Sequence, residues 1–375
     1  MNFKGWKPFP LYFAAMVAIQ QLTLVQFRNY IQKHFEFTHR IVGIVGSNGT
    51  GKTNVLDALY YLSFTKSYFN RPDAQNIHHA YEGMRMEGKY TIQKNVIPIP
   101  CIIRENSKKE FYFDEELYTK LSQHIGKIPC VMIAPDDVQI ITGHSEERRK
   151  LMDSLLSQLY PEYLKFLIQY NKILQQRNSL LKQASELGSV DTLLLETLNQ
   201  QLIDNGTPIY TYRKALLDDL LPEILKLYNY LAQNNDSIHI TYESALHTNS
   251  FNDMLKDAYA KDCLLQRTTV GIHKDDLHIT LQGQGFKQEA SQGQRKSLLF
   301  AIRLAEWQYI KKHKGFSPLL LMDDIFEKLD EQRMVQLLDW VSHQTDGQVF
   351  ITDTHKDRMN NLLGKYLNNY QLIEL

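Results

Sequence analysis

The sequence predicts an α/β fold that is interrupted by a helical second lobe. A short β-branched run at residues 40–45 is followed by a glycine-rich turn and then by helical spacing over residues 53–62. A second apolar run, "LLLM" at residues 319–322, ends in two aspartates. Between these segments, residues 146–232 are rich in Leu, Gln, Lys and Glu with apolar side chains three and four apart, which predicts several helices.

Composition and charge are those of an ordinary globular protein. The 375 residues are 43% apolar and 22% charged, and 42 lysines and arginines balance 42 aspartates and glutamates. A chain without net charge has no strong overall attraction to a polyanion or a membrane, so any contact with nucleic acid must come from a local patch. The 3 cysteines fit neither a zinc spacing nor a disulfide framework, which indicates reduced thiols in a cytoplasmic protein.

The first residues form an unusual N-terminal segment. "MNFKGWKPFPLYFAAMVAI" places Lys4 and Lys7 before an apolar run and superficially resembles a secretory signal peptide. The run is too short to span a bilayer, and regular alternation begins only after Met16, itself a candidate start codon. We expect residues 1–15 to be an N-terminal tail or the product of a misassigned start, and we expect no membrane contact.

A first lobe built from strands and one helix is expected over residues 16–145. Residues 18–37 alternate apolar and polar side chains and predict two strands on either side of "RNY". The strand at residues 40–45 and the helix at 53–62 come next, and further strand-like runs recur between residues 84 and 134.

A helical insert is expected over residues 146–265, with breaks near Gly188 and around Gly206–Pro208. Prolines interrupt the apolar spacing of this insert, and no heptad seam persists across them, so a compact insert is favoured over a long coiled-coil rod. Strand character returns at "SIHITYES" and "DLHITL". Residues 266–375 are expected to complete the first lobe.

The glycine-rich turn carries the most specific motif of the chain. The residues that match G-x-x-x-x-G-K-[ST] are Gly46, Ser47, Asn48, Gly49, Thr50, Gly51, Lys52 and Thr53. The glycines let the backbone curl, so that its N–H groups point at phosphate oxygens. Lys52 supplies a positive charge for the β and γ phosphates, and Thr53 offers its hydroxyl to Mg²⁺. The motif predicts a bound nucleotide with Mg²⁺.

A second strand is expected to supply the carboxylates of the same site. The run "LLLM" ends in Asp323 and Asp324, and a buried strand with a carboxylate at its tip suits a nucleotide-bound magnesium ion. Asp323 is the expected residue on the Mg²⁺ side, and Asp324 is placed to act as the base that polarises the attacking water. Because Lys52 and Asp323 lie far apart in the sequence, a large insertion must separate the two halves of the site.

The segment "ASQGQRKS", directly before "LLFAIRLAEW", predicts a helix start that attracts an anion, because the first N–H groups of a helix are unpaired. "SQGQRKS" resembles the signature loop of ABC-type ATPases, in which the signature of one subunit caps the ATP in the P-loop of another. This resemblance implies that Ser291, Gly293 and Gln294 bind the γ-phosphate of the partner's ATP. It also implies that "EKLD" (327–330) is the D-loop, with Asp330 as its acid.

Several stretches together resemble the RecF family within that superfamily. They are "FRNY" (27–30), "GSNGTGKTNVLDALYYLSFTKS" (46–67), "APDDVQIITGHSEERRKLMD" (134–153), "GIHKDDLHITL" (271–281), "SQGQRKSLLFAIRLAE" (291–306) and "LLLMDDIFEKLD" (319–330). The adjacent Asp323 and Asp324 also look RecF-like, since most relatives carry Asp-Glu there. The fold implied is an ABC-type ATPase head, a P-loop NTPase with a mixed sheet, plus a helical second lobe.

The same resemblance implies an ATP-dependent, DNA-binding recombination mediator with weak, slow ATPase activity. ATP and Mg²⁺ would bind as two subunits close into a homodimer, which would hold duplex DNA, gapped DNA or single-strand/double-strand junctions by their phosphates. It further implies cooperation with the mediators RecO and RecR in loading the recombinase RecA, in DNA repair, replication and the SOS response.

Some positions of the family pattern stay open. Gln139 is the candidate for a Q-loop glutamine. A switch histidine would be expected directly after the strand "QVFIT", but Asp353 stands there and His355 comes two residues later, so the role of His355 is open. Arg28 is either a phosphate contact or a surface arginine. Lys66 and Arg71 are either contacts to DNA or nucleotide, or solvated charges.

Three other classes of protein are alternatives. An SMC or Rad50-like ATPase would need a long coiled-coil arm, which the proline-broken insert does not suit. A transporter ATPase subunit would carry the usual LSGGQ signature and Asp-Glu, where this chain has "ASQGQ" and Asp-Asp. A defence-system ATPase of the overcoming-lysogenisation type usually has an added nuclease domain, and we expect none here.

Overall fold

The computed structural model describes residues 17–92, 94–233, 236–326, 330–366 and 369–375. Two compact units make up the chain, and each is described by itself. Unit 1 comprises the residues up to Pro135 and those from Trp307 onward, and unit 2 comprises Asp136–Glu306. The expected N-terminal tail, residues 1–15, lies outside the described residues.

A five-stranded parallel sheet forms the centre of unit 1. Its strands, in spatial order, are β14 (Gln371–Glu374), β3 (Ile41–Val45), β13 (Val349–Asp353), β12 (Leu319–Met322) and β8 (Cys130–Ile133). All residues of β3, β8, β12 and β13 are buried, which explains why these strands read as continuous apolar runs. Because the strands are parallel, their carboxyl ends lie along one edge.

A six-stranded antiparallel sheet accompanies it in unit 1. Its strands, in spatial order, are β2 (Tyr30–Glu36), β1 (Ala18–Phe27), β4 (Met84–Ile92), β5 (Asn95–Ile103), β6 (Lys109–Phe113) and β7 (Glu116–Leu117). The predicted strand pair around "RNY" is confirmed, since β1 and β2 pair antiparallel through Phe27 and Tyr30. One apolar core joins side chains of both sheets with those of the helix after the P-loop.

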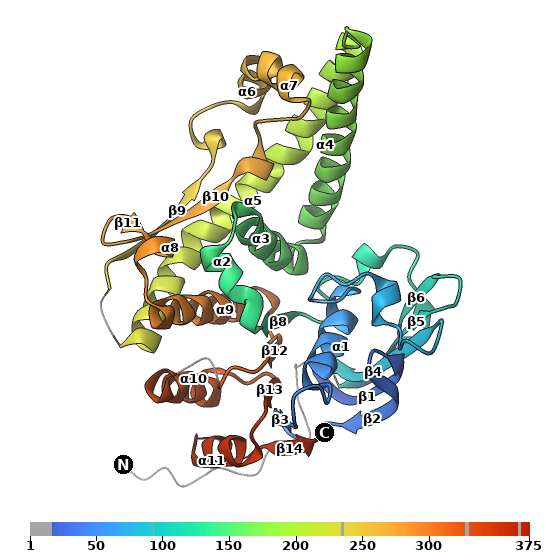
Figure 1. Cartoon of the computed structure of the whole chain (residues 1–375), viewed down its shortest axis with the longest axis vertical. Helices are drawn as coiled ribbons and strands as arrows, with labels where there is room; N and C mark the ends of the chain where they lie inside the picture. Colours follow the sequence, from blue (N-terminus) through green and yellow to red (C-terminus); the bar gives the residue numbers. More distant parts are fainter. Residues whose placement is uncertain (1–16, 93, 234–235, 327–329, 367–368) are drawn as a thin grey trace. The chain divides into compact units, whose positions relative to one another are not determined.

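The helices of unit 1 flank the parallel sheet. They are α1 (Lys52–Phe64), α10 (Glu331–Gln344), α11 (Lys356–Tyr366), the short η1 (Asp73–Asn76) and η2 (Leu121–Gln123), and the end of α9 (Gln292–Lys314). Figure 1 shows α10 and α11 on one side of the parallel sheet, and α1 with the antiparallel sheet on the other. The predicted helix at 53–62 is confirmed as α1.

Unit 2 consists of helices and one small sheet. Its helices are α2 (Gln139–Thr142), α3 (Ser145–Leu159), α4 (Pro161–Leu187), α5 (Thr192–Ala232), α6 (Phe251–Asp257), α7 (Tyr259–Leu265), α8 (Phe286–Glu289) and the start of α9, with the short η3 (Pro135–Val138), η4 (Ala245–His247) and η5 (Ile272–Lys274). The sheet has the order β11 (Gln284–Gly285), β10 (Asp276–Leu281) and β9 (Ile238–Glu243). Among the described residues of the whole chain, no helix has both the length and the apolar character of a membrane span.

One of the two predicted helix breaks is wrong. The break at Gly188 is confirmed, because α4 ends there on a left-handed residue. The break at Gly206–Pro208 does not occur, since α5 has 41 residues in all and includes both positions without interruption. A Cβ at Gly206 would lie 2.5 Å from Cε1 of Phe251, so this glycine permits close packing within a helix. Buried leucines and isoleucines on both sides of Pro208 offset the helix penalty of a proline, about 3 kcal/mol.

The division into units also differs from the predicted domain boundaries. Residues 266–306, expected to belong to the first lobe, form part of unit 2. The reason is strand pairing, because β10 pairs along its whole length with β9 at the end of the helical insert. Arg148 adds a two-pronged contact to Asp276, with N–O distances of 2.6 and 2.9 Å. The signature segment therefore belongs to the same unit as the helical insert.

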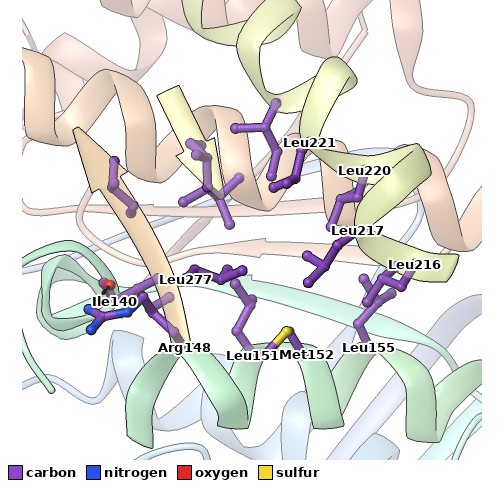
Figure 2. A pocket seen from close by; sticks show the side chains of 14 residues that line it. Ile140, Arg148, Leu151, Met152, Leu155, Leu216, Leu217, Leu220, Leu221 and Leu277 are labelled. Carbon is purple, nitrogen blue, oxygen red and sulfur yellow. Dashed lines mark hydrogen bonds between the residues drawn. The ribbon is translucent and has the colours of Figure 1, made fainter. Parts of the chain in front are cut away.

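An apolar pocket in the core of unit 2 is a packing gap and not a ligand site. Figure 2 shows leucines of α3 and α5 facing one another across it, with Arg148 at one end. Its free volume is about 10 Å³, which is room for one water molecule at most. The guanidinium of Arg148 donates to the carbonyl of Ile140 at 3.2 Å, so its charge does not enter the apolar space unpaired.

Candidate functional site

The P-loop lies between β3 and α1 and is shaped by its glycines. Gly49 and Gly51 have φ of 86° and 107°, in the left-handed region that favours glycine. Since α1 begins at Lys52, its first unpaired N–H groups face this loop. The ammonium group of Lys52 donates to the carbonyl oxygens of Gly46 at 2.7 Å and Ser47 at 3.0 Å. The positive charge is thereby held at the loop, where a phosphate chain would lie.

The residues predicted for the Mg²⁺ side do meet in space. The hydroxyl of Thr53 donates to both carboxylate oxygens of Asp323 at 3.0 Å, and that of Thr352 donates to one of them at 2.8 Å. Thr53 follows β3 by way of the P-loop, Asp323 follows β12, and Thr352 lies near the end of β13. Because these three strands are adjacent and parallel, their carboxyl ends bring the side chains to one corner.

Asp323 is suited to a cation by its environment. Burial raises the pKa of its carboxyl, and the hydrogen bonds from Thr352 and Thr53 only partly oppose this effect. A divalent cation would favour the ionised form. Among the described residues, no cluster of three or more His, Cys, Asp or Glu could hold a metal alone. Thr53 and Asp323 therefore fit Mg²⁺, which takes one or two carboxylates and completes its shell with phosphate and water.

A polar pocket joins the P-loop to the two aspartates. Its volume is about 190 Å³, and it is lined by Asn48, Gly49, Gly51, Lys52, Thr53, Asn54, Asp323 and Asp324. Asp324 has a left-handed backbone with φ of 49°, and its N–H donates to the Thr352 hydroxyl at 2.9 Å. This strained conformation, which non-glycine residues seldom adopt, places the predicted base at the same pocket as Lys52.

A second set of residues, which the sequence did not predict, holds the backbone of the P-loop through hydrogen bonds. Asn29 donates to the carbonyl of Thr50 at 2.9 Å, and Asn54 on α1 donates to Asn29 at 2.7 Å. Tyr30 donates to the carbonyl of Gly51 at 3.1 Å. The "FRNY" stretch can be identified in the sequence, but its contact with the P-loop depends on the turn between β1 and β2, which places Asn29 and Tyr30 next to the loop. These residues fix the loop geometry that phosphate binding requires.

Arg28 is not a surface arginine, and a contact of its side chain with phosphate stays a prediction. Its side chain is only 5% exposed and forms an ion pair with the fully buried Asp57 of α1. It also donates to Asn54 at 2.7 Å and to Asn76 at 3.0 and 3.2 Å. Arg28 therefore ties α1 and η1 to the β1–β2 turn. Lys66 and Arg71 are exposed on the segment after α1, and their contact with DNA or nucleotide stays a prediction.

In unit 2, the predicted signature residues form a reciprocal helix cap. The backbone N–H of Ser291 donates to the side chain of Gln294 at 2.8 Å, and the N–H of Gln294 donates to the Ser291 hydroxyl at 3.2 Å. This is a capping box, which defines where α9 begins. Gln294 also donates to Asp236 at 3.0 Å, so its side chain is held on both sides. Ser291 is exposed and Gly293 is half-buried, and phosphate binding by this loop stays a prediction.

The remaining candidates have local roles in the structure. Asp330 caps α10 by accepting from the N–H of Arg333 at 3.0 Å, and residues 327–329 of the expected D-loop lie outside the described residues. His355 is exposed, with its Nδ1 2.6 Å from the Thr354 hydroxyl. Gln139 is exposed at the start of α2. Their roles toward a nucleotide stay open.

Comparison with known proteins gives consistent matches. Residues 18–371 match the family model described as RecF/RecN/SMC N terminal domain. The DNA replication and repair protein RecF of Flavobacterium johnsoniae is 38% identical over 357 residues, which cover 95% of this chain and 99% of that protein. The protein of the same name from Phocaeicola vulgatus is 37% identical over 356 residues, covering 94% of this chain and 95% of that protein.

Solved structures agree with these matches. The structure of the recombination mediator protein RecF with ATP, in the RecFOR pathway, has a TM-score of 0.85 at 25% identity and covers 93% of this chain and 95% of that chain. An Smc head domain derived from Pyrococcus furiosus, with a TM-score of 0.54 at 14% identity, covers 92% of each chain and shares the fold. The fold and the site thus define an ABC-type ATPase head of the kind found in SMC proteins. Within that class, the chain belongs to the RecF family.

Proposed function

We propose that this protein is an ATP-dependent, DNA-binding recombination mediator that uses slow ATP hydrolysis as a switch. The observation that carries the proposal is the polar pocket in which Thr53 and Asp323 meet beside Lys52, with Thr352 donating to Asp323 from the neighbouring strand. The RecF relatives, named for DNA replication and repair, and the RecF structure with ATP support the choice of ATP and DNA as ligands.

Four residues of the pocket have distinct tasks. Lys52 and the N–H groups at the start of α1 bind and orient the β and γ phosphates. Thr53 and Asp323 hold Mg²⁺, which when bound neutralises charge on the phosphates. Asp324 accepts a proton from the attacking water. An aspartate reaches less far than the glutamate found in most ABC-type relatives, which is consistent with slow hydrolysis suited to a switch.

The exposed signature loop supports closure of two subunits around ATP. Ser291, Gly293 and the N-terminus of α9 would bind the γ-phosphate held by the partner subunit, with Gln294 shaping the loop and Asp330 lying in the D-loop. The closed homodimer would bind duplex, gapped or junction DNA through phosphates with little reading of sequence. We further propose that it acts with RecR and RecO-type mediators in loading RecA.

The first test measures the mass in solution by light scattering, with and without Mg-ATP, for the wild type and for Ser291→Arg. The wild type is expected to dimerise only with Mg-ATP. Ser291→Arg is expected to bind ATP and stay monomeric. The long arginine side chain would occupy the space that the γ-phosphate of the partner's ATP needs next to residue 291. Ser291→Ala, which loses the same helix cap without added bulk, is the matched control for the cap. A mass that does not respond to ATP, or a normal dimer of Ser291→Arg, would refute closure through this loop.

A further inference from the structure

One face of unit 2 carries a group of cations that the proposed function has not used. The group comprises Arg149 near the start of α3, Lys261 on α7, Arg267 just after α7, and Lys274 in η5. We call these four residues the α7–η5 basic patch, and α7 is labelled in Figure 1. Lys261, Arg267 and Lys274 are exposed, and Arg149 is half-buried.

The carboxylates nearest this patch have their direct ion-pair partners inside the unit. Asp262 and Arg177 form a fully buried pair at 2.7 Å. Asp275 pairs with the buried Arg213 at 3.1 Å and accepts from Tyr242 at 2.6 Å.

The neighbouring Asp276 is engaged as well, because it pairs with Arg148 at 2.6 Å. Within the ion pairs formed by the described part of the chain, none involves a member of the patch. The patch therefore presents positive charge to solvent without a direct ion pair, and the nearby carboxylates of Asp262, Asp275 and Asp276 attract its cations only in part.

The cations lie close enough to act on one another. Partial burial and then the charges of Arg267 and Arg149 lower the pKa of Lys274, which Asp262 opposes and Lys261 reinforces. Burial lowers the pKa of the adjacent His273 to about 4. A hydrogen bond to the carbonyl of Thr268 opposes this effect, and the charges of Lys274 and Arg149 add to it. The imidazole of His273 therefore adds no charge at neutral pH. Like charges held together are unfavourable unless an anion neutralises them.

The backbone that carries the patch is fixed in place. Thr268 donates to Asn178 through both its N–H, at 2.7 Å, and its hydroxyl, at 2.8 Å. Gly271 has a φ of 118°, and a Cβ there would lie 2.7 Å from Cζ of Phe251 and from the hydroxyl of Tyr170. Only glycine suits this turn, which leads directly into η5. A pre-organised surface loses little conformational entropy when it binds a ligand.

One cationic side chain of the patch, that of Arg149 on α3, is also held by its neighbours. Arg149 donates to the carbonyl oxygen of Asp275 at 2.7 Å, which ties α3 to the end of η5. Asp275 is itself held by Arg213, so the contact extends from the surface to the core of unit 2. The backbone of the patch and the side chain of Arg149 are therefore held in place by the core of unit 2.

We propose that the α7–η5 basic patch binds the phosphate backbone of duplex DNA, with Arg267 and Lys274 as its principal contacts. This proposal rests on the proposed function, which requires a DNA-binding surface on a chain of zero net charge. Cations without direct ion-pair partners, spread over α3, α7 and η5, match a regular row of phosphates better than a single small anion, because each cation can take a separate phosphate. The patch binds without reading sequence.

The test is binding of a fluorescent duplex to the full chain with Mg-ATP, at several salt concentrations. Arg267→Gln with Lys274→Gln is expected to lower the affinity about ten-fold near 0.1 M salt and to reduce the slope of log K against log salt by about 2. Lys274→Arg keeps the charge and is expected to bind as the wild type does. Lys214→Gln with Lys226→Gln, on α5, is the matched control, since Asp218 and Glu223 already balance those charges.

The outcomes separate the two proposals. ATP affinity and melting temperature are measured for every variant, and because Lys274 is exposed, Lys274→Gln alone serves as the folded variant if the double substitution unfolds the chain. Wild-type affinity and slope in the Arg267/Lys274 variant, or an equal loss in the α5 control, overturn the patch and leave the proposed function standing. Absence of ATP-dependent DNA binding by the wild type overturns both.

Discussion

At the scale of single residues, the carboxylate of Asp323 has opposite effects on nucleotide binding and on stability. It is expected to hold Mg²⁺, but in the nucleotide-free protein its burial lowers the free energy of unfolding. Its carboxyl is buried, and burial raises its pKa above the ordinary 3.8. Below the ordinary pKa both folded and unfolded states are protonated and the group has no effect on stability. As the pH rises above that value, the unfolded state ionises first, so stability is lost progressively until the folded pKa is passed.

Asp323→Asn is therefore expected to raise the melting temperature of the nucleotide-free protein at pH 8, with a gain that shrinks toward pH 4. The same variant is expected to bind Mg²⁺ more weakly, because the carboxylate that holds the cation is lost. Melting curves in chelator across this pH range, and titration with Mg-ATP, measure the two effects. Asp346→Asn is the control of opposite sign, because hydrogen bonds from Lys311 and Ser317 outweigh burial and lower the pKa of Asp346. A melting temperature of Asp323→Asn below that of the wild type at pH 8 would contradict the argument.

The residues of the site could be predicted where the chemistry is local in sequence. Lys52 and Thr53 belong to one continuous motif, and Asp323 ends an apolar run, so each was visible without a structure. Thr352 and Asn29 were not visible in this way. Their roles depend on which strands are neighbours and on a turn packed beneath the P-loop, and neither fact is encoded in spacing along the chain.

At the scale of elements, α5 shows why a glycine and a proline did not end a helix. A Gly→Ala change inside a helix ordinarily stabilises by about 1 kcal/mol. At Gly206 the new Cβ would lie 2.5 Å from Cε1 of Phe251 and 3.0 Å from Cε2 of Tyr170. Overpacking of this kind costs about 1–3 kcal/mol, so Gly206→Ala is expected to destabilise the protein despite its better helix propensity.

Chemical denaturation of Gly206→Ala against Asn205→Ala measures this effect. Asn205 directly precedes Gly206 on α5, is half-buried and donates to the carbonyl of Gln201 in the same helix, so its replacement is expected to be close to neutral. A Gly206→Ala variant more stable than the wild type would show that the contact with Phe251 relaxes without cost. The low helix propensities of glycine and proline predict a break here. They carry no information about the packing of Phe251, which lies on α6 about 45 residues later in the chain.

At the scale of the whole molecule, the sequence predicted the fold class and the helical insert but not where the units divide. The class followed from the motifs and their buried strands, which are properties of short segments. The division follows from the pairing of β9 with β10, which assigns the signature segment to unit 2 while the pocket residues all belong to unit 1. The proposed closure of two subunits therefore uses a segment of unit 2 that lies outside the nucleotide pocket, and we expect mutation to separate closure from nucleotide binding.

The melting temperature measures that separation, because ligand binding and dimerisation both stabilise the folded state by mass action. Mg-ATP at 100 times its dissociation constant stabilises a folded monomer by about 2.7 kcal/mol whatever the protein concentration, whereas a dimer melts at higher temperature as protein concentration rises. Wild type with Mg-ATP is expected to show both effects. Ser291→Arg is expected to keep the first and lose the second, since its substitution lies outside the pocket residues of unit 1. Loss of the ATP-induced shift itself in Ser291→Arg would mean that the signature loop supports the pocket of its own chain, and the assignment of Ser291 to the partner's ATP would be wrong.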